Sequence, residues 1–306
     1  MNAHVTVGVD IGGTTTRIVA FAADGAVLAE RLSATPQGGP AVLAHVLGEY
    51  EAVTAGLAPV RHIGVGVPGR VTADGEVAMA LNVGITHPVP LAALLRAQLA
   101  VPVVVENDVN AAAVAALAAL GGSSLTYLSI GTGFAVGSIV DGRVIRGATG
   151  GAGEIGHVPI PHETVPCVCG QLGCIEAIVS GRALSDAAEA IGLGASANVT
   201  DLWNAAESGR PEALAVQARA VTALAWAAQV AVLMLDVEHV VFGGGVSDLG
   251  ERLVRPIREL LAEREAMSPW LASVGPSRRI RLAPGNGHLG AIGADLSARR
   301  RLDGAS

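Results

Sequence analysis

One arrangement of strands and glycine turns occurs twice in this chain of 306 residues. Residues 5–28 predict an apolar strand, a glycine turn, a second apolar strand, an Asp-Gly turn and a third strand. Residues 125–145 repeat this order with the same two kinds of turn, at an offset of nearly 120 residues. Because a repeated supersecondary unit indicates a duplicated architecture, we expect two related lobes that face each other.

The segments around the two copies alternate between expected strands and helices. The expected elements before the second copy are helices at about 40–56 and 90–99, strands at 61–69 and 101–107, and a helix that begins at Asp108. Those after it are helices at 181–192, 211–235, about 249–265 and about 289–301, and a buried strand within 239–247. This alternation is typical of an α/β fold.

Composition excludes several classes of protein. All 20 basic residues are arginine, so a phosphate-loop lysine and a pyridoxal Schiff base are excluded. The net charge is −7 without a basic stripe, and we expect no nucleic-acid partner. The N-terminus does not resemble a signal peptide, and the longest apolar run, 220–235, is shorter than the roughly 20 residues of a membrane-spanning helix. We therefore expect a cytoplasmic protein without a membrane partner.

The glycine turns of both copies can bind an anion through backbone N–H groups. "DIGGTTT" at 10–16 lies between two strands, and the hydroxyls of Thr14, Thr15 and Thr16 could add donors. A hairpin that uses glycine only for its geometry is the alternative. The repeat at 129–137, "SIGTGFAVG", favours a polyphosphate held from both sides, with Asp10 as a carboxylate for magnesium through water.

Two further glycine and carboxylate motifs follow predicted strands. "FGGGVS" at 242–247 permits close approach of a ligand, although a strand-to-helix turn explains it almost as well. "END" at 106–108 places Asn107 and Asp108 at a strand's carboxyl end, where open α/β sheets bind ligands. Asp108 is either the helix cap, worth about 1 kcal/mol, or a catalytic carboxylate that accepts a hydroxyl proton in phosphoryl transfer.

The three cysteines, at positions 167, 169 and 174, lie within eight residues. Thiols stay reduced in the cytoplasm, so clustered cysteines favour metal ligation over disulfides. Their spacing is typical of a turn that wraps zinc, and His157 or His162 would be the fourth ligand. Four protein ligands leave no open position, so the zinc is expected to be structural.

Seven motifs in order, over nearly the whole chain, resemble those of the ROK family of bacterial sugar kinases and repressors. They are "DIGGTTT", "GVPG", "ENDVNAAA", "SIGTGFAVG", "GAGEIGH", "CVCGQLGCIEAIVSGRAL" and "FGGGVS". The resemblance implies an α/β fold of the actin-like ATPase (ribonuclease H-like) hexokinase type, with two lobes around a cleft. The smaller lobe would comprise 1–107, joined by a C-terminal helix at about 290–306. The larger lobe, 108–289, would contain the zinc site.

The resemblance also implies ATP-dependent phosphorylation of the 6-hydroxyl of an aldohexose, with Asp108 as general base and Mg-ATP as donor. The sugar would be glucose or an N-acetylhexosamine, either N-acetylglucosamine or N-acetylmannosamine. The implied sugar-binding residues are Gly69, Arg70, Asn82, Asn107, Asp108, Glu154, His157 and Glu176. The implied nucleotide-binding residues are Asp10, Gly12, Gly13, Thr14, Thr15, Thr132, Gly133, Gly244 and Gly245. The implied zinc ligands are His157, Cys167, Cys169 and Cys174.

Some alternatives stay open at this stage. Thr15 stands where many relatives carry lysine, which leaves backbone donors for the phosphates. Arg70 either favours an acetamido sugar or is a solvated surface residue. The protein could instead be a non-catalytic sugar-binding regulator of the same family, or a structural zinc protein without a ligand, but binding alone does not need a base such as Asp108. We expect a homodimer or homotetramer.

Overall fold

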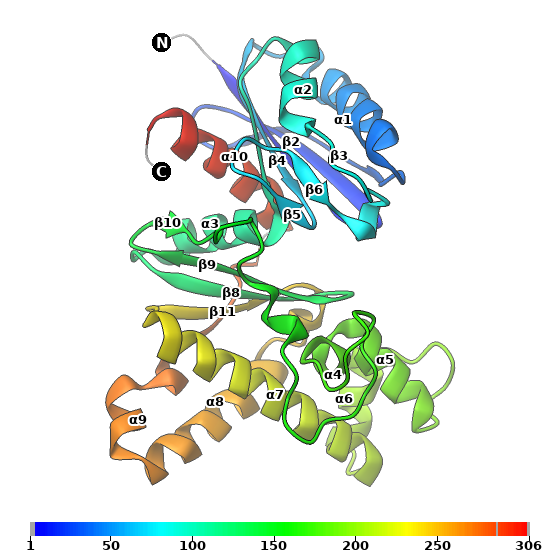
Figure 1. Cartoon of the computed structure of the whole chain (residues 1–306), viewed down its shortest axis with the longest axis vertical. Coiled ribbons are helices and arrows are strands. Elements are labelled where there is room, and N and C mark those ends of the chain that lie inside the picture. The colour runs from blue at the N-terminus through cyan, green and yellow to red at the C-terminus, as the bar shows by residue number, and fades with distance from the viewer. Residues whose placement is uncertain (1–3, 286, 305–306) are drawn as a thin grey trace. The chain divides into compact units, whose positions relative to one another are not determined.

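The computed structural model describes residues 4–285 and 287–304, which form two compact units (Figure 1). The first unit comprises Met1–Gly121, Arg143–Ala152 and Pro284–Ser306, and the second comprises Gly122–Gly142 and Gly153–Ala283. The predicted lobes are 1–107 with 290–306, and 108–289. The division differs from them because the first unit also includes the helix that follows Asn107, the segment Arg143–Ala152 and the residues from Pro284 onward. Residues 1–3, 286, 305 and 306 of those predicted lobes lie outside the described residues.

The first unit is built on a five-stranded sheet of order β3-β2-β1-β4-β7. Its strands are β1 (Val5–Ile11), β2 (Thr15–Phe21), β3 (Val27–Ala34), β4 (Val60–Val67) and β7 (Val103–Asn107). β1, β2 and β3 pair in antiparallel fashion, whereas β1, β4 and β7 are parallel. The parallel strands are rich in buried valine, as expected for strands covered on both faces.

Helices cover both faces of this sheet. They are α1 (Gly39–Thr54), α2 (Leu91–Leu99), α3 (Asp108–Leu120) and α10 (Leu289–Leu302). Figure 1 shows α1 and α2 on one side and α10 on the other, where it packs against α3, β1 and β4. A short hairpin of β5 (Arg70–Val71) and β6 (Val77–Met79) and the 3₁₀ turn η1 (Leu81–Val83) follow β4.

The C-terminal helix α10 packs directly on the backbone of the sheet. A β-carbon at Gly8 of β1 or Gly64 of β4 would overlap a backbone carbonyl group of α10, so only glycine permits this approach. Gly293 of α10 permits an equally close approach to α3. A buried hydrogen bond between His62 Nε2 and Asp295 Oδ1, 2.8 Å apart, adds a polar link between β4 and α10. The chain's last helix is therefore an integral part of the first unit.

The second unit repeats the strand plan of the first. Its strands run in the order β9-β8-β11-β12, with bounds β8 (Leu125–Ile130), β9 (Phe134–Val140), β11 (His239–Gly243) and β12 (Ile280–Leu282). β8 and β9 form an antiparallel hairpin, and β8, β11 and β12 are parallel, just as β1 pairs with β2 and with β4. The strand β10 (Arg143–Val144) follows β9 along the chain but belongs to the first unit. The predicted duplication is therefore present in the strand pairing within each unit.

The remaining elements of the second unit are mainly helical. The helices are α4 (Glu176–Val179), α5 (Gly181–Ala190), α6 (Val199–Glu207), α7 (Pro211–Leu235), α8 (Glu251–Met267) and α9 (Pro269–Val274). The 3₁₀ turns are η2 (Glu154–His157), η3 (Gly245–Leu249) and η4 (Pro276–Arg279). α7 and α8 pack against each other beside the sheet (Figure 1).

The helix α7 combines length with low polarity. The apolar run 220–235 is too short for a membrane span by itself, but the helix that contains it is long and apolar enough by length and composition. Half of its 18-residue apolar window is buried inside the structure. Buried alanines of α7 and Leu224 contribute to the hydrophobic core of the second unit, which gives α7 the burial of a core helix.

We predict that Gly64→Ala destabilises the first unit by about 3 kcal/mol, because its methyl group would overlap the Ala294 carbonyl and force α10 away from the sheet. Gly48→Ala in α1 is the matched control. A β-carbon there meets no atom within 4 Å, and alanine favours a helix over glycine by about 0.5–1 kcal/mol. Chemical denaturation followed by circular dichroism measures both. Equal stability of the two variants would show that α10 does not depend on this close approach.

Candidate active site and metal cluster

The junction between β7 and α3 carries the predicted catalytic carboxylate. β7 ends at Asn107 and α3 begins at Asp108. Asn107 Oδ1 accepts the N–H of Asn110 at 3.0 Å, which makes Asn107 the N-cap of α3. The interpretation of Asp108 as the cap is therefore wrong, because the cap position lies one residue earlier. Asp108 occupies the first turn, where its Oδ1 accepts the N–H of Val109 at 2.9 Å and the helix dipole favours its charge.

Asn107 also joins the start of α3 to the "GVPG" turn after β4. Its Nδ2 donates to Gly69 O and to Asp108 Oδ1, each at 3.0 Å. Gly69 has a φ of 89°, and a β-carbon there would overlap the carbonyl of Met79. Arg70 follows with an exposed side chain at the start of β5. The structure thus brings Gly69, Asn107 and Asp108 together within the first unit.

The first glycine hairpin joins β1 to β2. Gly12 N–H donates to Thr15 O at 2.8 Å and closes the turn. The buried hydroxyl of Thr16 hydrogen-bonds with that of Thr35 at 2.8 Å. The Thr16 hydroxyl therefore forms a hydrogen bond inside the fold, whereas the sequence suggested that it could donate to an anion. The residues at the tip are exposed: Gly13, Thr14 and Thr15.

Asn82, which was assigned to the sugar set, lies beside this first hairpin. A β-carbon at Gly13 would be 3.5 Å from both Asn82 Cβ and Asn82 O. The Asn82 carbonyl accepts a hydrogen bond from Gln37 Nε2 at 3.5 Å, and the residue is exposed. Within the first unit, Asn82 is therefore a neighbour of a predicted nucleotide-binding turn.

Asp10 lies near the end of β1 and its carboxylate contacts the first turn of α10. A β-carbon at Gly290 would overlap that carboxylate, so glycine is needed for the contact. Burial raises the pKa of Asp10, and the nearby Arg17 guanidinium acts in the opposite direction. Burial disfavours the ionised form of this carboxylate, and a cation bound nearby would stabilise it. This agrees with the oxygen donor expected of a magnesium site.

The second glycine hairpin, between β8 and β9, is held by Glu176. Gly131 N–H donates to Gly133 O at 3.0 Å, and Phe134 N–H donates to Glu176 Oε2 at 2.8 Å. Gly244, with a φ of 80°, approaches the end of β8 so closely that a β-carbon would lie 2.6 Å from Ile130 O. Residues of two predicted sets, for the nucleotide and for the sugar, therefore lie near one another within the second unit. They are the hairpin residues Thr132 and Gly133, the turn residues Gly244 and Gly245, and the carboxylate of Glu176.

The turn η2 carries Glu154 and His157, and it packs against β9. β-Carbons at Gly153 and Gly156 would overlap or crowd the backbone carbonyls of Val136 and Phe134. Glu154 is exposed and His157 is half-buried. The turn that carries both side chains is therefore fixed to β9, and the first residue of β9, Phe134, donates its N–H to Glu176.

His157 and the three cysteines form a compact cluster. One potential ligand atom from each of His157, Cys167, Cys169 and Cys174 lies within 4.8 Å of the others. His157 Nδ1 is 3.6 Å from Cys167 Sγ, and the Sγ atoms of Cys169 and Cys174 are 3.6 Å apart. Tetrahedral zinc with bonds of about 2.0–2.3 Å would place such atoms about 3.5–3.8 Å apart. The donor set therefore fits a four-coordinate metal, and its histidine is His157.

Gln171 lies beside this cluster and was not identified from the sequence. Its Nε2 donates to His157 O at 3.1 Å and to Cys169 Sγ at 3.4 Å. The hydrogen bond from Gln171 lowers the pKa of the exposed Cys169 thiol to about 6. Burial raises the pKa of Cys174 to about 12. The turn therefore stabilises one thiolate by hydrogen bonding, while the buried thiol depends on a cation to lose its proton.

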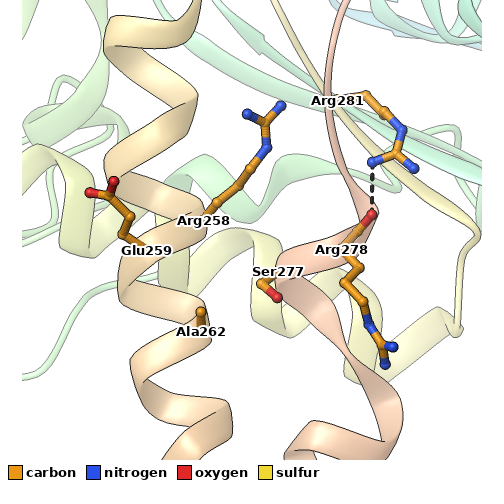
Figure 2. Close-up of a pocket in the computed structure, with 6 residues that line it drawn as sticks. All are labelled: Arg258, Glu259, Ala262, Ser277, Arg278 and Arg281. Carbon is orange, nitrogen blue, oxygen red and sulfur yellow. Dashed lines mark hydrogen bonds between the residues drawn. The ribbon is translucent and has the colours of Figure 1, made fainter.

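A surface groove between α8 and the η4–β12 segment is rich in arginine (Figure 2). Its lining residues are Arg258, Glu259, Ala262, Ser277, Arg278 and Arg281. Arg258 Nη1 donates to Glu251 Oε2 at 2.7 Å, and Arg281 Nη1 donates to the carbonyl of Arg278 at 2.7 Å. These guanidinium groups have partners inside the protein, and no residue of the predicted sugar, nucleotide or metal sets lines the groove. We therefore do not assign the functional site to it.

The duplicated α/β units, with a glycine hairpin in each, define the actin-like ATPase fold of the sugar kinases. A model of the ROK family matches residues 6–301, and the chain therefore belongs to the ROK family, which confirms the resemblance of its motifs. The solved structure of a ROK family glucokinase from Streptomyces griseus, in complex with glucose and AMPPNP, superposes with a TM-score of 0.76 at 29% identity. The superposition covers 97% of this chain and 99% of the glucokinase chain, and it confirms the expected fold.

Two curated relatives are sugar kinases. The glucokinase of Halalkalibacterium halodurans is 30% identical over 277 residues, which cover 83% of this chain and 84% of that protein. The N-acetylmannosamine kinase of Vibrio cholerae is 32% identical over 267 residues, which cover 86% of this chain and 91% of that protein. The similarity therefore supports sugar kinase activity and spans two classes of sugar substrate.

Proposed function

We propose that this protein is an ATP- and magnesium-dependent kinase that phosphorylates the 6-hydroxyl of glucose or of an N-acetylhexosamine. The observation that carries the proposal is the placement of Asp108. It lies in the first turn of α3, at the carboxyl end of a parallel strand, and the cap of that helix is already supplied by Asn107. The helix thus does not need Asp108 as a cap, and the position suits a carboxylate that faces a ligand.

In this proposal Asp108 accepts the proton of the sugar 6-hydroxyl, while the 6-oxygen of the sugar forms a bond to the γ-phosphorus of ATP. The bond from the γ-phosphorus to the β,γ-bridging oxygen breaks, and ADP leaves with the electron pair of that bond. Because the transition state is loose, alignment and charge neutralisation matter more than a strong base. Asn107 supports the alignment, since its Nδ2 donates to Asp108 Oδ1 and to the Gly69 carbonyl.

The nucleotide would be bound by backbone donors of the two glycine hairpins, one in each unit. The exposed tip residues Gly13 to Thr15 and the turn at Thr132–Gly133 offer N–H and hydroxyl groups without lysine. Asp10 would hold the magnesium ion of Mg-ATP through water. The related glucokinase from Streptomyces griseus was solved with AMPPNP, an analogue of ATP, which supports ATP as the donor.

The metal cluster would hold a structural zinc ion. When bound, zinc would cross-link His157 with Cys167, Cys169 and Cys174 and supply folding free energy. Glu176 follows Cys174 by two residues and bonds to Phe134 N–H, so a rigid cysteine turn would also fix this carboxylate. His157 and Glu154 would then contact sugar hydroxyls from one turn, with Glu176 beside them.

We predict that Asp108→Asn lowers kcat by about 10²–10⁴-fold while the affinity for sugar changes little, because positioning survives and proton acceptance does not. α3 should remain intact, since its cap is Asn107 Oδ1. A coupled ADP assay and calorimetric titration with sugar measure the two quantities. Loss of sugar binding together with turnover would contradict the role as base.

We predict that the purified protein contains one zinc ion and that its removal lowers the unfolding temperature of the second unit. Cys169→Ser should lose the metal, because a hydroxyl is a poor substitute for a thiolate ligand. Val168→Ser is the matched control, since this exposed neighbour is not in the cluster. Elemental analysis and calorimetry give metal content and stability. Unchanged stability after chelation would refute a structural metal.

The preference between glucose and an N-acetylhexosamine can be tested at Arg70, the exposed residue after Gly69. If Arg70 contacts an acetamido group, Arg70→Ala should lower the ratio of kcat/KM for N-acetylmannosamine over glucose about tenfold, the loss of one charged hydrogen bond. Arg61→Ala is the control, since Arg61 is an exposed arginine of the same unit that pairs with Asp303 at 3.2 Å. Unchanged sugar ratios would make Arg70 a surface residue.

The regulator hypothesis has its own outcome in these assays. Protein that binds a hexose with measurable heat but releases no ADP from Mg-ATP would be a sugar-binding regulator. Protein that binds no hexose and still contains zinc would be a structural zinc protein. The expected homo-oligomer and the cytoplasmic location stay predictions.

A further inference from the structure

Glu106 is a buried carboxylate immediately before the Asn107–Asp108 pair. Its side chain is 2% exposed and accepts hydrogen bonds on both oxygens. Oε1 accepts the backbone N–H of Asn107 at 3.1 Å and the Nδ2 of Asn110 at 3.3 Å. Oε2 accepts Arg146 Nε at 3.0 Å and Arg301 Nη2 at 2.9 Å, and a second nitrogen of Arg146 also contacts it.

These donors come from separate parts of the first unit. Asn107 and Asn110 belong to the start of α3, Arg146 to the segment Arg143–Ala152, and Arg301 to the last turn of α10. Arg301 also donates to the carbonyl of Ala73 at 3.1 Å, which ties it to the loop between β5 and β6. The carboxylate of Glu106 is therefore the point where three segments attach to the end of β7.

The network leads to Asp108 through two short connections. Glu106 Oε1 holds the side chain of Asn110, while Asn107 Oδ1 caps the backbone N–H of the same residue at 3.0 Å. Asn107 is thereby fixed at its backbone N–H and at its side chain, and its Nδ2 is the group that donates to Asp108 Oδ1. Glu106 Oε1 therefore holds the backbone of Asn107 and the side chain of Asn110, while the Asn107 side chain bridges Asn110 and Asp108.

Packing alone does not account for a charged residue here. A buried ion pair loses much of its attraction to desolvation, and apolar residues of similar size often replace such pairs without loss of stability. A carboxylate differs from an apolar side chain in accepting several hydrogen bonds in fixed directions. At Glu106, two of these bonds orient the junction that carries Asp108 and two anchor the carboxylate itself.

We propose that Glu106 is a positioning residue for the kinase reaction, anchored by Arg146 and Arg301, and that it fixes the Asn107–Asp108 pair in its reactive orientation. This inference rests on the proposed function, in which Asp108 is the base. It adds to that function a residue which touches neither substrate nor nucleotide and acts through Asn107.

Glu106→Gln keeps the shape of the side chain but places an amide where two arginines need a carboxylate. We expect kcat to fall about 10–100-fold, since a displacement of the reacting group by about 1 Å costs about 100-fold. The KM and the calorimetric affinity for sugar should change far less. In the background of Asp108→Asn, Glu106→Gln should add almost nothing, because the group that it positions no longer acts as a base.

Asp295→Asn is the matched control for a purely structural loss. Asp295 is as deeply buried as Glu106 and pairs with His62 and Arg299 in the same unit. This variant should lower the unfolding temperature and leave kcat near the wild-type value at a temperature where it is folded. If Glu106→Gln does not fold, Arg146→Met tests the positioning role instead, because Arg301 still pairs with the Glu106 carboxylate in that variant. Arg146→Met should lower kcat while the affinity for sugar changes little.

The outcomes separate this inference from the proposed function. If wild-type protein forms no sugar phosphate from Mg-ATP, the proposed function fails and the inference fails with it. If wild type is active and Asp108→Asn is not, the proposed function stands. The positioning role is then overturned by a Glu106→Gln variant with wild-type kcat, by losses that multiply fully with those of Asp108→Asn, or by a fall in kcat that Asp295→Asn shares.

Discussion

The close approach of α10 to the backbone of β1 and β4 is the constraint on which the first unit depends. Glycines at positions 8, 64 and 293 allow it, and the buried pair of His62 with Asp295 adds to it. Once seated, α10 contributes to both predicted functional regions of the unit. Its first turn contacts Asp10, and its last turn provides Arg301 to Glu106. The helix α10 therefore contacts both the carboxylate proposed to hold magnesium and the network next to the proposed base.

The second unit uses a different device at the equivalent hairpin. There a carboxylate, Glu176, accepts the N–H of Phe134 directly after the glycine turn, and the same carboxylate follows the last cysteine of the metal cluster by two residues. One histidine and three cysteines that could hold a metal ion lie in the chain before Glu176. The first unit therefore holds its predicted site residues with a buried carboxylate, its arginine partners and a helix, whereas in the second unit a metal bound by one imidazole and three thiols would serve that purpose.

Most regular elements could be predicted because their signals are local. The helix expected at 211–235 was found as Pro211–Leu235, and the strand expected at 101–107 was found as Val103–Asn107. Several elements were not predicted, among them α4, α6, α9 and β12. β12 has three residues and exists by pairing with β11, a contact that no short sequence pattern encodes. α6 does have a capping box at Asn198 and Asp201, a signal that was present in the sequence and was overlooked.

The sequence by itself determined the family, the order of the motifs and the clustering of the cysteines, because each depends on residues close together along the chain. The tertiary structure places His157, the histidine that the resemblance implied, beside the cysteines. It alone decided that Asn107 caps α3 and that Thr16 is used inside the fold. It also decided the partners of Glu106, since Arg146 and Arg301 lie 40 and 195 positions away. Such contacts form only when the sheet and α10 bring distant segments together. A buried carboxylate is stable only when it is paired, and here the fold places two arginines beside it.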